Sequence, residues 1–132
     1  MHHSFTIDAE SRLAISRIRG EMTPEAVAQQ YSDILTHPDW QSHFDHLVVF
    51  DHIDMSLITS EEMRRLSQLV GALDREYGRS ANSRTALVLD KEGQTAIMTM
   101  YEVLAASEVV TEERVFQTEH EAMAWLRSPR AG

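Results

Sequence analysis

The sequence LVVFDHID, residues 47–54, joins an unbroken apolar run to two aspartates. Its first four residues are apolar without alternation, which indicates a strand covered on both faces and is typical of a parallel strand inside an α/β layer structure. Ligands and partners of open α/β sheets commonly bind beyond the carboxyl ends of the strands. The polar residues that follow this strand therefore form the candidate interaction surface: Asp51, His52, Asp54, Ser56, Thr59 and Ser60.

The chain before the central strand predicts a hairpin and a helix. Apolar and polar residues alternate at 5–8, a polar turn follows at 8–11, and residues 13–18 are again compatible with a strand, so we expect an antiparallel edge. Residues 23–25, Thr-Pro-Glu, predict a helix start with an N-cap, a proline at the first position and a carboxylate in the first turn. Residues 37–39, His-Pro-Asp, predict the end of this helix.

The chain after the central strand predicts alternating helices and strands. Residues 59–62, Thr-Ser-Glu-Glu, form a capping box, and the helix that follows has an apolar face and a glycine stop. Its apolar face consists of Met63, Leu66, Val70, Leu73 and Tyr77, and Gly78 is the expected stop. We then expect a strand at 85–89, a helix over 97–104, a strand in the second half of 109–116 and a capped helix from 118, with Ala122, Trp125 and Leu126 facing inward.

The predicted order is therefore ββαβαβαβα. Strands that are separated by single helices require right-handed crossovers and a mostly parallel sheet. We expect an α/β fold with a five-stranded sheet and one antiparallel edge strand. Residues 1–127 would form a single domain, because cores of about 100 to 150 residues are the commonest size. Residues 128–132 would form a disordered tail.

Composition limits the classes of function. The chain has 12 Lys and Arg against 21 Asp and Glu, a net charge of −9, which disfavours binding to nucleic acid and to anionic membrane surfaces. It has no cysteine, which excludes disulfides, zinc thiolate sites and thiol nucleophiles. The amino terminus lacks the apolar core of a signal peptide, and no run of 18 apolar residues occurs, so we expect a soluble cytoplasmic protein.

Two groups of residues could suggest catalysis or metal binding. Histidines alternate with aspartates around the central strand, but without the spacing of an established metal motif, so we expect solvated residues and no metal or cofactor. These residues are His37, His43, His46 and His52 with Asp39, Asp45, Asp51 and Asp54. Asp51, His52 and Ser56 could be imagined as a hydrolytic triad, but the strained Gly-x-Ser-x-Gly turn is absent. We predict no catalytic residues, and a metal-dependent enzyme is only a remote alternative.

Several segments resemble a known family. The order of elements together with LVVFD at 47–51, MYE at 100–102, RVF at 114–116 and EAMAWL at 121–126 resembles the SpoIIAA-like proteins of the STAS superfamily. The resemblance implies a five-stranded sheet with four or five helices. The best-known members are anti-sigma factor antagonists that act by protein contact. This branch has also been likened to lipid-binding CRAL-TRIO domains, which implies an apolar pocket under the helices.

The turn after the central strand departs from the family pattern. Anti-sigma factor antagonists have an Asp-Ser-Ser-Gly type turn with a phosphorylated serine, whereas residues 54–60 here are Asp-Met-Ser-Leu-Ile-Thr-Ser without the glycine. Capping alone accounts for Thr59 and Ser60. The resemblance therefore carries over the fold and the position of an interaction surface, and phosphorylation of Thr59 or Ser60 is left open.

We expect a non-enzymatic STAS-like module that binds a protein partner or a second copy of itself as a homodimer. The alternative is a carrier or sensor of a small apolar, lipid-like ligand, for which methionines could line an adaptable pocket. The methionines in question are Met55, Met63, Met98, Met100 and Met123. A continuous cavity between sheet and helices would favour the carrier, whereas a filled core with an exposed apolar patch would favour the partner module.

Overall fold

The computed structural model describes residues 2–54, 59–89 and 111–130, with only the backbone at 52–54. Its elements are β1 (His2–Asp8), β2 (Leu13–Glu21), α1 (Pro24–Leu35), β3 (Asp45–Asp54), α2 (Ser60–Glu76), β4 (Arg84–Leu89), β5 (Glu112–Phe116) and α4 (Glu119–Arg127). The helix predicted over 97–104 lies outside the described residues, so the number of helices stays a prediction.

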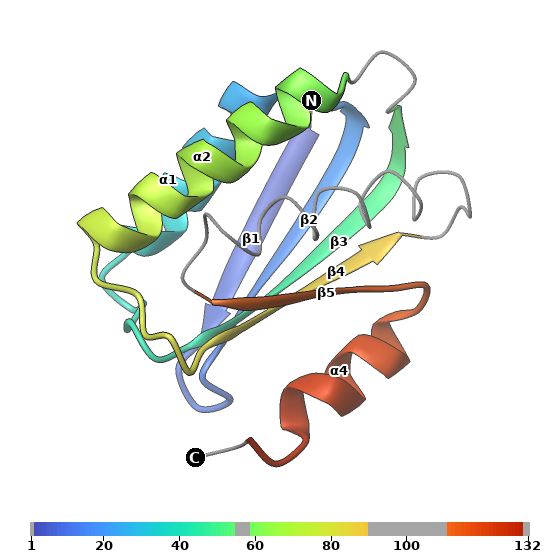
Figure 1. Cartoon of the computed structure of the whole chain (residues 1–132). Helices are drawn as coiled ribbons and strands as arrows, with labels where there is room; N and C mark the ends of the chain where they lie inside the picture. The colour runs from blue at the N-terminus through green and yellow to red at the C-terminus, as the bar shows by residue number, and fades with distance from the viewer. Residues whose placement is uncertain (1, 55–58, 90–110, 131–132) are drawn as a thin grey trace.

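The five strands form one sheet in the order β1-β2-β3-β4-β5, which is also their order in the chain. The β1–β2 pair is antiparallel and the other three pairs are parallel. Helices α1 and α2 cover one face of the sheet, and α4 covers the other face (Figure 1). The prediction of an α/β fold with a mostly parallel five-stranded sheet and one antiparallel edge is confirmed.

The central strand β3 is buried on both faces, as its apolar run predicts. Val48 and Phe50 pack in the core under α1 and α2, whereas Leu47 and Val49 pack in the core under α4. All four side chains are at most 6% exposed. Strand β4 has the same pattern, because every one of its residues is buried.

Three threonine caps fix where the helices begin. The hydroxyl groups of Thr23, Thr59 and Thr118 accept hydrogen bonds from backbone N–H groups three residues later, at 3.2, 3.1 and 3.2 Å. All three predicted starts are therefore confirmed. The helix α2 ends before Gly78, whose positive φ of 65° is the conformation that favours glycine.

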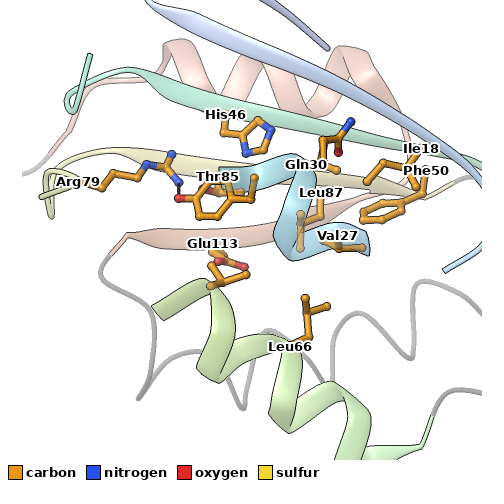
Figure 2. A pocket seen from close by; sticks show the side chains of 13 residues that line it. Ile18, Val27, Gln30, His46, Phe50, Leu66, Arg79, Thr85, Leu87 and Glu113 are labelled. Carbon is orange, nitrogen blue, oxygen red and sulfur yellow. Dashed lines mark hydrogen bonds between the residues drawn. The ribbon is translucent and has the colours of Figure 1, made fainter. Parts of the chain in front are cut away.

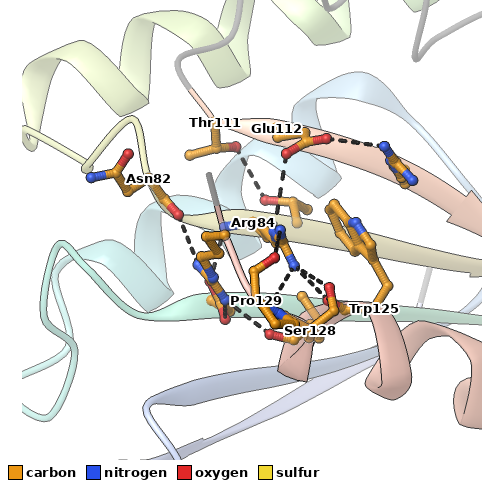
Figure 3. Close-up of polar contacts among 12 residues, drawn as sticks. Asn82, Arg84, Thr111, Glu112, Trp125, Ser128 and Pro129 are labelled. Carbon is orange, nitrogen blue, oxygen red and sulfur yellow. Dashed lines mark hydrogen bonds and ion pairs between the residues drawn. The ribbon is translucent and has the colours of Figure 1, made fainter. Parts of the chain in front are cut away.

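Arginine side chains hold α4 and the residues after it against the sheet. Arg84 is buried in β4 and its Nη1 donates to the Trp125 carbonyl at 2.6 Å and to the Ser128 hydroxyl at 2.8 Å (Figure 3). Arg130 forms an ion pair with Asp45 at the start of β3. Residues 128–130 thus contact side chains of two strands, and the disorder expected for residues 128–132 stays a prediction.

One further detail differs from the sequence prediction. Tyr77, expected on the buried face of α2, caps the end of the helix and is 40% exposed. Within the described residues, no helix is both long enough and apolar enough to cross a membrane.

The cap at Thr59 gives a test of local stability. Thr59→Ala removes the acceptor for the Glu62 N–H and should lower the free energy of unfolding by about 1 kcal/mol. The melting temperature should fall by roughly 2 to 6 °C, measured by calorimetry. Thr59→Ser and Thr59→Asp can both cap and should keep the wild-type stability. A loss in these two variants equal to that of Thr59→Ala would contradict the capping role.

Candidate functional site

The structure describes only part of the interaction surface that the sequence predicts. Asp51 is half-buried near the end of β3, and Thr59 and Ser60 are exposed at the start of α2. The side chains of His52 and Asp54, and Ser56 entirely, lie outside the described residues. The Asp51 side chain contributes to a shallow depression on the sheet, together with His2, His3, Ser4, Arg17 and Arg19. Sequence reasoning missed the two arginines beside Asp51.

The predicted histidine and aspartate group is dispersed. His46 is buried under α1, whereas Asp45 lies at the opposite face and pairs with Arg130. His37 packs edge-on against Phe5. Among the described residues no three histidine, aspartate or glutamate side chains come together in a way that could hold a metal ion.

A cavity lies between the sheet and the helices α1 and α2 (Figure 2). Its volume is about 50 Å³, counted as the space that the centre of a water molecule can occupy. The cavity is partly open to solvent. Its apolar lining comes from both strands and helices: Ile18, Val27, Val48, Phe50, Leu66, Val70 and Leu87. Its polar lining consists of Gln30, Tyr31, His46, Arg79, Thr85 and Glu113. In Figure 2, Ile18 and Phe50 lie at one end, and Arg79 and Glu113 lie toward the other.

Arg79 is the centre of the polar end of this cavity. It directly follows Gly78 and is only 4% exposed. Its Nη1 donates to the Tyr31 hydroxyl at 2.6 Å and its Nη2 donates to the Arg84 carbonyl at 3.3 Å. The Nε of Arg79 is buried and finds no hydrogen-bond acceptor among the described residues. The guanidinium therefore retains one donor that a ligand could satisfy.

Tyr31 connects Arg79 to a buried carboxylate. Its hydroxyl donates to Oδ1 of Asp74, a residue with no exposed surface. Burial raises the pKa of Tyr31 above its ordinary value, so the hydroxyl stays protonated and can bridge the two charges. The backbone N–H of Arg79 also donates to the Asp74 carbonyl at 2.9 Å. This network fixes the guanidinium at the cavity wall, because a buried charge requires compensation.

Aromatic rings enclose the same charge. The Arg79 guanidinium carbon lies 5.7 Å from the centre of the Tyr31 ring and 5.5 Å from that of Trp40. His46 stacks on Tyr31, with ring centres 5.6 Å apart and planes 4° from parallel. Burial first, and the charge of Arg79 second, lower the pKa of His46 to about 3. His46 is therefore neutral near pH 7.

The contact between His46 and Ser16 joins an imidazole to a hydroxyl, the two groups that act as base and nucleophile in serine hydrolases. Nε2 of His46 lies 2.7 Å from the Ser16 hydroxyl. Ser16, however, has no exposed surface, does not line the cavity and lies within β2. Nucleophilic serine must be reachable by substrate. The pair therefore satisfies two buried polar groups and gives the site no covalent chemistry.

The two described methionines of the five that were expected to line a pocket do not line this cavity. Met63 packs in the core under α2 and Met123 packs on the α4 side of the sheet. The other three, Met55, Met98 and Met100, lie outside the described residues. The polar residues of the cavity were missed as well, although Asp74 follows Val70 by four residues on the inward face of α2. A carboxylate at an inward helix position is the signal that could have revealed the network.

No model of a known protein family matches the chain, and no curated protein matches its sequence significantly. The resemblance to SpoIIAA-like proteins therefore stays a prediction. The cavity is the feature of the described residues that bears on function.

The pKa of His46 predicts how stability depends on pH. The folded state holds this pKa at about 3, below the ordinary value of 6.5, so protons bind preferentially to the unfolded chain between these values. The contribution of His46 is thus fully present above pH 6.5 and is lost as the pH falls toward about 3. The loss should be up to about 1.4 kcal/mol per pH unit.

Urea unfolding at pH 7, 6 and 5 measures this effect in wild type and in His46→Gln. Glutamine can still bond to Ser16 but does not titrate, and the other ionisable groups are common to both proteins. The wild type should lose stability more steeply than the variant below pH 6.5. Parallel pH profiles would contradict the neutral buried state of His46.

Proposed function

We propose that this protein is a non-enzymatic binding module for a small molecule with an apolar body and one uncharged, hydrogen-bonding head group. The observation that supports this proposal is the lining of the cavity, where a buried guanidinium, a carboxyl group and four further polar side chains share one space with seven apolar ones. The carrier or sensor alternative considered from the sequence is thereby preferred to the partner module.

The size of the cavity limits the ligand. One water molecule needs roughly 10 to 15 Å³ of such volume, so a cavity of about 50 Å³ has room for a few heavy atoms. It would take a small molecule whole, or one end of a longer molecule that leaves through the opening. The apolar residues on both walls favour an aliphatic body over a fully polar ligand.

The charges in the wall select the head group. Arg79 opposes a cation and Glu113, half-buried on β5, opposes an anion. A hydroxyl or amide can accept from Nε of Arg79 and donate to an oxygen of Glu113 or Thr85. An uncharged group avoids the cost of burying a further ion. The polar end of the cavity thus supports an alcohol-like or amide-like head group rather than a fatty-acid carboxylate.

The exposed surface gives the partner module less support. Within the described part of the chain, Tyr77 is the large apolar residue that is exposed, and a single residue of this kind is normal on a protein surface. The resemblance to SpoIIAA-like proteins, with its link to CRAL-TRIO domains, is compatible with a pocket under the helices. A cytoplasmic location is also part of this proposal, and the lack of cysteine is compatible with a reducing compartment.

A regulatory protein contact is a second candidate function. It is supported by the uncovered polar surface around Asp51, Arg17 and Arg19 and by the exposed hydroxyl groups of Thr59 and Ser60. A contact around Asp51 could coexist with ligand binding, because that part of the surface lies on the face of the sheet opposite to the cavity, whereas Thr59 and Ser60 start α2 on the cavity side.

Binding of 1-butanol, butyrate and butylammonium tests the proposed function. These probes share an aliphatic body and differ in the charge of the head group. Amide NMR shifts on titration should show 1-butanol binding at least about tenfold more tightly than either ion, a difference of about 1.4 kcal/mol. The shifts should centre on residues around the cavity, such as Tyr31 and Leu66. Absence of saturable shifts for all three probes would overturn the proposal.

Two substitutions with a matched control sharpen this test. Val27→Phe fills the cavity from α1 and should abolish 1-butanol binding, whereas Ile15→Phe, on the opposite face of the sheet, should leave it unchanged. Glu113→Gln removes the carboxyl group and should improve butyrate binding relative to 1-butanol. Equal effects of Val27→Phe and Ile15→Phe would place the binding site elsewhere.

A further inference from the structure

Strand β1 is the outer strand of the sheet, and no described element pairs with its free edge. It contains seven residues, His2–Asp8, and pairs with β2 without a bulge. Edge strands are usually protected by lysine, proline or a bulge, because their free N–H and C=O groups can pair with another chain. β1 has none of these features.

We propose that the free edge of β1 pairs with β1 of a second copy of this chain, antiparallel and centred on Phe5. This inference is independent of the proposed small ligand. Phe5 is the middle residue of the seven, so a two-fold axis there places each residue opposite the one at the same distance from the other end. The facing pairs are Phe5 with Phe5, Ser4 with Thr6, His3 with Ile7, and His2 with Asp8.

The side chains of this strand are complementary to themselves under that symmetry. The ladder with β2 places Phe5 opposite Ser16 and His3 opposite Ile18, on the face covered by α1 and α2. Phe5 and Ile7 are half-buried in one copy, and pairing would cover the remaining parts of both. On the other face, hydroxyl groups would meet and an imidazole would face a carboxylate. The aromatic pair at the axis, the hydroxyl pairs and the imidazole–carboxylate pairs are favourable cross-strand pairs, His3 with Ile7 is the one mixed pair, and no pair brings like charges together.

Other alignments of the two strands are less favourable. A shift of two residues keeps the same faces together but leaves two residues of each seven-residue strand without a partner. A shift of one residue places Phe5 opposite Thr6 and Ile7 opposite Ser4, so that both apolar residues of the strand face polar ones, whereas only Ile7 does so in the Phe5-centred alignment. The Phe5-centred alignment is the one that pairs all seven residues.

The strand is already held in the shape that pairing needs. Gln30 of α1, 2% exposed, donates to the Ser4 carbonyl at 3.2 Å, and the Phe5 ring packs edge-on against His37 with centres 6.0 Å apart. A carbonyl oxygen has two lone pairs, so the bond from Gln30 leaves Ser4 able to take part in a ladder. The ordering cost of association is therefore reduced.

Single cysteines in this cysteine-free chain test both the contact and its alignment. Ser4→Cys faces residue 6 of the second copy, and Thr6→Cys faces residue 4, at the short separation that a disulfide requires. Mixing the two variants under mild oxidation should give the mixed disulfide in large excess over either symmetric disulfide, measured by mass spectrometry. Each variant alone should stay largely uncrosslinked, because residue 4 of one copy does not face residue 4 of the other, and the same holds for residue 6.

The outcomes are decisive in both directions. In an equimolar mixture, a mixed disulfide only twice as abundant as each symmetric one is the statistical result and would mean random collision. An excess of a symmetric disulfide would mean another alignment. Either result would overturn the proposal, as would no disulfide at all. Light scattering gives an independent readout: wild type and Phe5→Leu should show twice the mass of Phe5→Lys, since two lysines would meet at the axis. A monomer mass for the wild type at every accessible concentration would also overturn it. Urea unfolding checks that all variants are folded.

Discussion

Burial of β3 on both faces is the constraint on which the rest of this structure depends. A strand with apolar side chains on alternating faces, all at most 6% exposed, requires a layer of helices on each side. The helices α1 and α2 provide one layer and α4 provides the other. Among the described helices α4 alone packs on the second face, against β3, β4 and β5, and no described helix covers the polar residues of β1 and β2 on that face.

The two layers differ in how they treat charge. Under α1 and α2, the network of Asp74, Tyr31 and Arg79 places opposite charges inside the core, at the wall of a cavity. Under α4, Arg84 is buried in β4 but directs its guanidinium to backbone oxygens at the end of the helix, where the helix dipole favours a cation. The first arrangement is suited to recognising a ligand, and the second attaches a helix to the sheet.

The elements of the fold were predictable because their signals are local. The apolar run at 47–50 indicates double-sided burial, and threonine caps at 23, 59 and 118 mark helix starts through hydrogen bonds that span three residues. The cavity was not predictable in the same way. Tyr31 is 43 residues from Asp74 and 48 from Arg79 in the sequence, and only the packing of α1 on α2 and the sheet brings it to them. The contacts of residues 128–130 also depend on distant partners, Arg84 and Asp45.

The order of strands in the sheet has a consequence for synthesis on the ribosome. Each strand pairs with the one made just before it, so the sheet can grow from β1 as the chain emerges. The helix α4 follows all five strands in the chain, so it can pack on the sheet only after β5 has been made. Until it emerges, Leu47, Val49 and Val88 lack the side chains of α4 that pack against them. The apolar side chains under α4 thus become fully packed late in translation, and incompletely covered apolar surface of this kind favours aggregation.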